Sequence, residues 1–493
     1  MRTYLRRIKA RYYVILTFVI VIYWCNSMCT SGHSNSPIRD REGAAFAGST
    51  TCISCHATIY QSHIHTAHYL DSRPAAKEFI KGSFDSGKNR FIYNKEREVL
   101  LEQKGHLFYQ TAFINGKEAQ RHPFDIVIGS GRKGQTYLYW DRDNLFQLPI
   151  SYYTALNDWC ISPGYPTDAP VFNREVLAFC MECHSTYATI REPNTSGNNT
   201  FGSSTSGKDN PRNDNSRNSN SGPGNPNNGN AGSSVTPNGT SRNSVSGSSA
   251  FPNANSGNSA SPNATSDDNS SGQDFSNRND RFDQNQIIYG IDCERCHGPA
   301  AEHVAFHTAH PEEKSAHYIV NTRRLSRQQR LDACALCHSG GRAQLLPAFS
   351  FKAGDTLNKY SLAKYASTDE ATLDVHGNQY GLLSSSKCFI SSQMDCSSCH
   401  NVHVNEANNP KLFSERCMTC HDGTTHPGCK MTPTPGFVLS NNCIDCHMPL
   451  LPSQKILLTL SNSSQPIHNL VRTHRIAIYP ESTKEYLRNI KAQ

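Results

Sequence analysis

The chain is poor in apolar residues and lacks a long apolar run. Hydrophobic residues make up 36% of its 493 residues, below the usual share in globular proteins. The most apolar stretch, Tyr12 to Trp24, is shorter than the roughly 20 residues of a membrane-spanning helix. No basic run with interleaved aromatic residues is present, so the sequence does not predict nucleic-acid binding.

Residues 193–280 lack cysteine and histidine and consist mainly of Asn, Ser, Gly and Pro. A segment of this composition cannot bury enough apolar surface to fold. We predict a disordered insert that acts as a tether or spacer and that supplies no ligand to a cofactor.

Residues 1–30 start with basic residues and continue into the apolar stretch. This order is typical of a cleaved export signal, and an uncleaved N-terminal membrane anchor is the alternative. Both place the rest of the chain in the periplasm or elsewhere outside the cytoplasmic membrane. Cys25 and Cys29 are lipidation candidates, but the bulky Trp24 and Met28 before them fit a lipoprotein cleavage site poorly. The basic residues are Arg2, Arg6, Arg7, Lys9 and Arg11.

Cysteine, in contrast, is abundant, with 19 residues, of which 14 belong to seven Cys-x-x-Cys-His motifs. Every Cys-x-x-Cys in the chain is followed by histidine. In chain order, motifs 1 to 7 are Cys52/Cys55/His56, Cys180/Cys183/His184, Cys293/Cys296/His297, Cys334/Cys337/His338, Cys396/Cys399/His400, Cys417/Cys420/His421 and Cys443/Cys446/His447.

These motifs predict seven covalently bound c-type haems. Two thiols at this spacing reach the two vinyl groups of one porphyrin, and the adjoining imidazole is the proximal iron ligand. Zinc or iron–sulfur sites do not require a histidine after every cysteine pair, so we reject them. The haem propionates also offset the formal charge of +7, which therefore does not indicate an anionic partner.

Outside the motifs and the N-terminal segment, three cysteines remain: Cys160, Cys388 and Cys429. In an oxidising compartment two of them could form a disulfide, or all three could be buried thiols. The sequence leaves both alternatives open.

We expect a mainly α fold with extensive loops, with the haems as its core and a small antiparallel β insert. Motifs 3 to 7 lie within residues 285–475, which predicts a haem-packed C-terminal domain with little apolar core of its own. Motifs 1 and 2 belong to an N-terminal haem region, residues 45–192, and motif 2 stands apart from the others. Within that region, residues 89–155 have alternating apolar residues and turn signals at Asn115-Gly116 and 141–144, which predict the β insert.

The second axial ligands decide between electron transfer and catalysis. A haem with two histidine ligands is saturated, whereas a haem with an open axial site binds substrate. Fifteen histidines lie outside the motifs, enough for every haem, although none lies in residues 185–292 after motif 2. His307, His310 and His317 compete with His303, and we prefer His68 over His63 and His65. The candidate distal ligands are His68, His303, His376, His403, His426, His468 and His474.

Several segments resemble an exported bacterial multihaem cytochrome c family whose members are often fused to tetratricopeptide repeats. They include "TCISCHATIYQSHIHTAHYLDSRPA", "VIGSGRKGQTYLYW", "CERCHGPAAEHV", "DVHGNQYGLLSSSKCF" and "MDCSSCHNVH". The family is distantly similar to the haem-packing group of hydroxylamine oxidoreductase and the multihaem nitrite reductases. The resemblance implies closely stacked haems, a mostly helical fold and distal ligands at His68, His303, His376 and His403. Neither a helical repeat array nor the Cys-x-x-Cys-Lys motif of pentahaem nitrite reductases is present.

Three functions agree with these features. The first is an electron carrier that works with redox proteins or a quinol-linked membrane complex, with the N-terminus as a membrane attachment. The second is an oxidoreductase that acts on a small nitrogen or sulfur compound at one open haem, for which motif 2 is the candidate and no catalytic residue is identified. The third is a haem-bearing module whose β insert binds a partner. We favour the carrier.

Overall fold

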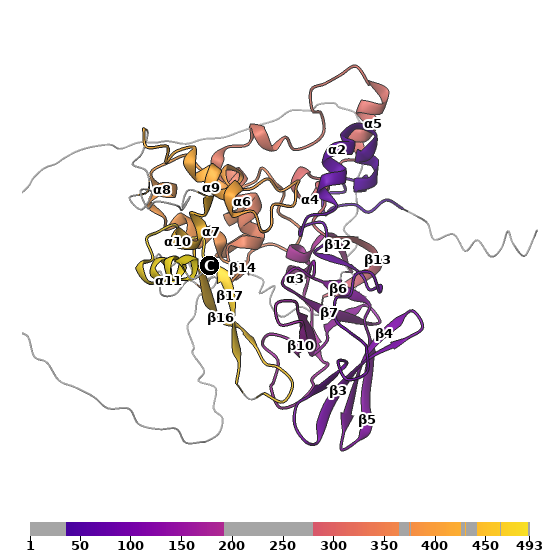
Figure 1. Ribbon diagram of the computed structural model, residues 1–493. Helices are drawn as coiled ribbons and strands as arrows, with labels where there is room; N and C mark the ends of the chain where they lie inside the picture. The colour runs from indigo at the N-terminus through magenta and orange to yellow at the C-terminus, as the bar shows by residue number, and fades with distance from the viewer. Residues whose placement is uncertain are drawn as a thin grey trace, which may run out of the picture. The chain divides into compact units, whose positions relative to one another are not determined.

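The computed structural model describes residues 36–191, 280–363, 374, 376–424, 429, 441–463 and 465–491. Helix and strand occupy nearly equal shares, 27% and 28%, and several antiparallel sheets are present (Figure 1). The expectation of a mainly α fold is therefore wrong. The motifs occupy short helices, but strands form much of the rest of the described chain.

The helices are mostly short. They are η1 (Ser49–Cys52), α2 (Ile53–His63), α3 (Ala178–His184), α4 (Cys293–His297), α5 (Ala301–Ala309), η3 (Thr322–Arg324), α6 (Arg327–His338), η4 (Leu357–Lys359), α7 (Gln379–Ser384), α8 (Lys387–Ile390), η6 (Cys396–Ser398), α9 (Pro410–Met418), α10 (Ile444–His447) and α11 (Pro480–Lys491).

The strands concentrate in the N-terminal half. They are β1 (Ser72–Pro74), β2 (Arg90–Ile92), β3 (Arg97–Lys104), β4 (Leu107–Ile114), β5 (Lys117–Pro123), β6 (Ile126–Ile128), β7 (Gly134–Asp141), β8 (Asn144–Gln147), β9 (Ile150–Tyr153), β10 (Asp158–Ile161), β11 (Arg174–Glu175), β12 (Ser185–Arg191), β13 (Arg281–Tyr289), β14 (Arg342–Gln344), β15 (Ser361–Ala363), β16 (Leu450–Leu458) and β17 (Ile467–Arg472).

Two antiparallel sheets form the β region. One has the order β2-β3-β4-β5, and the other has seven strands along the path β1-β6-β7-β8-β11, with β9 on β7 and β10 on β9. The region extends beyond residues 89–155, because β1 precedes that range and β10 and β11 follow it. Asn115 and Gly116 connect β4 to β5 with φ values of 51° and 73°, the left-handed pair that a tight hairpin turn requires.

The β region has an apolar core of its own. Phe91, Leu101 and Ile150 are almost fully buried, and Trp159 packs among aromatic rings that include Tyr137. The described C-terminal part has only small apolar clusters, such as the one around Leu336 and Phe351. Burial of apolar side chains therefore stabilises the β region.

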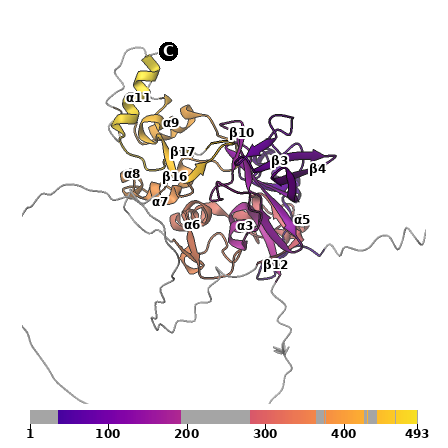
Figure 2. The same cartoon turned by 90° about the horizontal axis from the view of Figure 1, so that it is seen from below.

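The hairpin of β16 and β17 connects the C-terminal part to the β region. The backbone N–H of Ile161 in β10 donates to the carbonyl of Thr459 at 3.0 Å, and Cys160 forms a β-bridge with Leu460. Both views show this hairpin beside β10 (Figures 1 and 2). The C-terminal part is thus joined to the sheets through this hairpin.

Strands β12 and β13 pair in antiparallel fashion on the two sides of residues 192–279, with Ile190 opposite Phe282 and Arg191 opposite Arg281. The predicted disordered insert lies outside the described residues apart from Asp280. The predicted signal or anchor, residues 1–30, also lies outside them. In the part of the chain that the structure describes, no helix has the length and apolar character to span a bilayer.

Two leucines of the four-stranded sheet test the apolar core. Leu101 in β3 is fully buried, whereas Leu107 in β4 is 55% exposed. We expect Leu101→Ala to lower the free energy of unfolding by about 2–5 kcal/mol, because it leaves a cavity, and Leu107→Ala to change it by at most about 0.5 kcal/mol. Urea unfolding followed by circular dichroism measures both, and equal midpoints would contradict this account of the core.

Candidate functional site

The motifs are placed by short helices. Motifs 2, 3, 4 and 7 end α3, α4, α6 and α10 with their histidines, motif 1 spans the junction of η1 and α2, motif 5 starts in η6, and motif 6 starts in the last turn of α9. Asp292 and Asp395 precede the first cysteines of motifs 3 and 5. Their carboxylates accept hydrogen bonds from the backbone N–H groups of Glu294 and Ser397, which fixes the start of each motif.

Cysteines of different motifs contact each other. Four pairs of thiols lie close enough for each thiol to shift the pKa of its partner, and each pair takes one cysteine from each of two motifs. The pairs are Cys52 with Cys293, Cys183 with Cys337, Cys334 with Cys396, and Cys417 with Cys443. Motif 1 therefore touches motif 3, motif 2 touches motif 4, motif 4 touches motif 5, and motif 6 touches motif 7.

Several predicted attachment residues are exposed. In motifs 1 and 6 these are Cys55, His56, Cys420 and His421. The histidines of motifs 4 and 5, His338 and His400, are exposed as well. The attachment of these residues to haem stays a prediction.

The backbone of motif 1 also departs from a regular helix. His56 lies within α2 but has φ of −121° and ψ of 37°, values outside the helical region. The helix is therefore kinked at the predicted proximal ligand, between the cysteines of motif 1 and the histidine-rich turn that ends with His68. In motif 6 the backbone N–H of His421 donates to the carbonyl of Cys417 at 3.0 Å, so that motif continues the helical turn.

Side chains inside or next to the motifs make the remaining connections. The guanidinium of Arg295, in motif 3, donates to the carbonyl of Glu182, in motif 2, at 3.0 Å. Arg416, which precedes motif 6, donates to the carbonyl of Cys399, in motif 5, at 2.5 Å. Together with the thiol pairs, these contacts arrange the motifs in the unbroken order 1-3-2-4-5-6-7.

This order corrects one expectation. Motif 2 does not stand apart, because it contacts motif 3 through Glu182 and motif 4 through Cys183. The gap in the sequence misled the prediction, since β12 and β13 close that gap by pairing.

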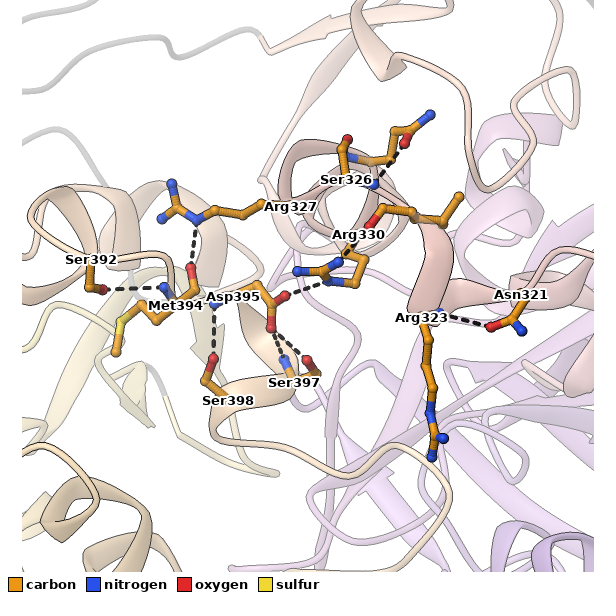
Figure 3. Close-up of polar contacts among 12 residues, drawn as sticks. Asn321, Arg323, Ser326, Arg327, Arg330, Ser392, Met394, Asp395, Ser397 and Ser398 are labelled. Atoms are coloured by element: carbon orange, nitrogen blue, oxygen red, sulfur yellow. Dashed lines mark hydrogen bonds and ion pairs between the residues drawn. The ribbon is translucent and has the colours of Figure 1, made fainter.

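The contact between motifs 4 and 5 includes a buried ion pair (Figure 3). Nε of Arg330, in α6, lies 2.6 Å from Oδ2 of Asp395, whose side chain is 6% exposed. The other carboxylate oxygen accepts from the backbone N–H of Ser397 at 2.9 Å, and Arg327 donates to the carbonyl of Met394 at 2.8 Å. Helix α6 is thus fastened to the start of motif 5 by several bonds.

Two buried glutamates lie between the cysteines of their motifs. The carboxylate of Glu294 accepts from the backbone N–H groups of Ala47, Gly48 and Ala300 at 2.8 to 2.9 Å. The carboxylate of Glu182 accepts from the N–H of Phe349 at 2.7 Å. These variable positions of the motifs are therefore structural anchors, a role that the spacing of the motif does not reveal.

Three motif histidines face a second imidazole. The ring centres are 6.1 Å apart for His338 and His68, 6.3 Å for His297 and His403, and 6.2 Å for His400 and His474. A metal ion bound at about 2 Å by one nitrogen of each ring would separate the ring centres by roughly 6 Å. The three pairs therefore have the spacing of two axial ligands on one iron.

Burial favours the neutral form of these rings. It lowers the pKa of His68 and of His474 to about 4, with further lowering by His338 and His400 respectively. Burial also lowers the pKa of His403. A neutral imidazole has the free lone pair that a metal requires.

Several motif histidines are oriented by hydrogen bonds through Nδ1. Nδ1 of His297 lies 2.8 Å from the carbonyl oxygen of Val320, and Nδ1 of His447 lies 2.9 Å from that of Ala477. Nδ1 of His338 lies 3.3 Å from the side-chain oxygen of Gln379. In this arrangement Nδ1 carries the proton and Nε2 is the nitrogen available to iron.

His184 of motif 2 has a different partner, the carboxylate of Asp71, with Nδ1 and Oδ2 2.8 Å apart. Burial alone would lower the pKa of His184, but the hydrogen bond and the charge of Asp71 outweigh it and raise that pKa. The sequence analysis missed Asp71, although it follows His68 by three residues in "HYLD".

The structure places the remaining candidates elsewhere. Nδ1 of His303 and of His468 lies 2.8 Å from a backbone carbonyl, but neither ring is paired with a motif histidine in the described chain. His376 lines a cavity of about 270 Å³ beside Cys337 and Lys455. His426 lies outside the described residues.

Two other histidines of the candidate segments have distinct surroundings. His63 is buried with its ring nitrogens 3.1 and 3.3 Å from the carbonyl oxygens of Ile291 and Val402. The preference for His68 stays a prediction. Nε2 of His307 is buried without a hydrogen-bond partner, so this competitor of His303 keeps a nitrogen available for a ligand.

The residues fit the predicted haems. The motif cysteines are thiols and form no disulfide among the described residues, three histidine pairs have the spacing of axial ligands, and several motif imidazoles leave Nε2 for iron. Cys160 and Cys388 are thiols as well and form no disulfide among the described residues.

Comparisons with known proteins add little. No family model matches the chain, and no curated protein matches it. A solved structure titled "Crystal Structure of Outer Cell Wall Cytochrome OcwA" is similar, with a TM-score of 0.45 and 13% sequence identity, over 89% of this chain and 81% of that chain.

Proposed function

We propose that this chain is an exported c-type cytochrome that carries seven covalent haems and conducts electrons along them. The observation that carries the proposal is the unbroken order of contacts between the motifs, 1-3-2-4-5-6-7. A conductor needs every attachment site to have a neighbour, and each of the seven motifs touches at least one other.

The two cysteines and the histidine of each motif would hold one haem, which when bound takes up and releases one electron. His68, His403 and His474 would be the second ligands at motifs 4, 3 and 5. A site with two imidazoles has no position for substrate. These three sites therefore suit electron transfer, and they lie in the interior of the contact order.

Motif 1 is the first in the contact order, and its second cysteine and histidine, Cys55 and His56, are exposed. Electrons enter and leave a carrier most readily where a haem edge meets solvent, so this end of the order suits exchange with a partner.

The cellular setting follows from the sequence. The basic and apolar N-terminal segment and the covalent haem motifs both favour a location outside the cytoplasmic membrane. The electron donors and acceptors that fit such a location are redox proteins or a quinol-linked membrane complex, with membrane attachment through the N-terminus. Nothing in the motifs calls for a nucleic acid.

The number of haems is directly measurable. We expect the intact mass of the purified protein to exceed that of the processed polypeptide by seven haem groups, which remain bound after denaturation because thioether bonds are covalent. Replacing both cysteines of motif 7, Cys443→Ser with Cys446→Ser, should remove one haem, whereas Cys429→Ser should leave seven. Absence of covalent haem, or disulfides between the motif cysteines, would contradict the proposal.

The histidine pairs predict a change of spin state. We expect His68→Ala to convert one of the seven haems from low spin to high spin, because His338 then lacks the imidazole opposite it. Electron paramagnetic resonance of the oxidised protein measures this change. His106→Ala, in an exposed turn of the β region, is the control and should leave the spectrum unchanged. An unchanged spectrum in His68→Ala would contradict the assignment of His68 to motif 4.

A second candidate is an oxidoreductase with its reaction site at motif 2. One observation favours it: no imidazole among the described residues pairs with His184 as His68 pairs with His338. Carbon monoxide binding to the reduced protein distinguishes the two functions. A carrier saturated at every haem forms no adduct, whereas an adduct that disappears in Cys180→Ser with Cys183→Ser, which removes the motif 2 haem, supports the reaction site.

A further inference from the structure

Asp71 is the carboxylate partner of a motif imidazole. Its Oδ2 lies 2.8 Å from Nδ1 of His184, and its side chain is 23% exposed. In the described chain Asp71 forms this ion pair and no other. The other motif imidazoles with a described Nδ1 acceptor face neutral oxygens, those of Val320, Gln379 and Ala477.

The backbone holds Asp71 in place from both sides. Its N–H donates to the carbonyl of His68 at 3.1 Å, and its own carbonyl accepts from the N–H of Gly129 at 2.5 Å, at the end of β6. The backbone of Asp71 is therefore fixed by a turn and a strand end, and the carboxylate reaches His184 from this fixed point.

A carboxylate that accepts a hydrogen bond from a ligating imidazole makes that imidazole a stronger electron donor to the metal. A stronger donor stabilises the higher oxidation state of iron and lowers the reduction potential. A neutral carbonyl in the same position has a smaller effect. Motif 2 thus differs from motifs 3, 4 and 7 in the charge of the acceptor at Nδ1: it is a carboxylate in motif 2 and a neutral oxygen in the others.

Resting on the haem-binding function proposed above, we propose that Asp71 is a positioning residue that holds the imidazole of His184 through Nδ1 and gives the motif 2 haem the lowest reduction potential of the series. Motif 2 lies between motif 3 and motif 4 in the contact order. The lowest-potential position then separates a short arm, motifs 1 and 3, from a long arm, motifs 4 to 7.

The same turn acts on the neighbouring site. His68, which accepts the N–H of Asp71 through its carbonyl, faces His338 of motif 4 with a ring-centre distance of 6.1 Å. One turn therefore supplies the charged partner of motif 2 and the second imidazole of motif 4. Movement of this turn would change two adjacent sites together.

The test is a spectroelectrochemical titration of the full-length protein and its variants. Asp71→Asn keeps a hydrogen-bond acceptor beside Nδ1 and removes the charge. We expect one of the seven one-electron components, the lowest, to move to higher potential, with about a tenfold larger ratio of reduced to oxidised haem at a given electrode potential, or about 59 mV. Asp71→Glu should restore the original component.

Two further variants keep the proposal testable if Asp71→Asn does not fold. Gln379→Glu places a carboxylate beside Nδ1 of His338 and should lower the potential of a different haem, while Asp143→Asn, a carboxylate paired with Arg191 at the surface, should shift nothing. If Asp71→Asn holds seven haems and the lowest reduction potential does not change, this inference is overturned and the proposed function is not. Absence of covalent haem would instead overturn the proposed function.

Discussion

A five-residue motif cannot place an imidazole on both faces of the porphyrin that it binds, and the rest of this structure depends on that constraint. The proximal histidine adjoins the second thioether cysteine, so the opposite imidazole must come from another segment. In all three described pairs it comes from far along the chain: His68 faces His338, His403 faces His297, and His474 faces His400. Each pair therefore closes a long loop, and loop closure of this kind has an entropic cost that other contacts must offset.

Polar contacts of residues in and beside the motifs help to offset this cost. Glu294 binds three backbone N–H groups, Asp395 binds Arg330, and Arg295 reaches the backbone of Glu182. Buried carboxylates are tolerated only when donors surround them, and these carboxylates meet that requirement. The variable positions of the motifs thus fix the motifs to one another, while the invariant positions are reserved for the cofactor.

The sequence was sufficient for the local features and insufficient for the long-range ones. The Asn115-Gly116 turn depends on two neighbouring residues, and their backbone agrees with it. The haem motifs and the preference for His68 over His63 also depend on local sequence and stay predictions. The strand content was underestimated because short strands such as β1 and β11 have too few residues to show the alternation of apolar and polar residues that is typical of a strand. His403 follows motif 5 in the sequence but faces His297 of motif 3. This pairing depends on tertiary contacts, which the spacing of residues along the chain does not reveal. The same limit hid Asp71, whose partner His184 is remote in sequence.

The position of motif 2 follows from the pairing of β12 with β13. Motif 2 ends at His184, and β12 begins at the next residue, while motif 3 begins at Cys293, shortly after β13 ends at Tyr289. Because the two strands run antiparallel, their pairing brings the end of motif 2 next to the start of motif 3. The hydroxyl of Thr186 donates to the carboxylate of Asp292 at 3.0 Å, which fixes that junction. The number of residues between the strands does not enter this geometry, so an insert at this point can grow or shrink while motifs 2 and 3 stay in contact.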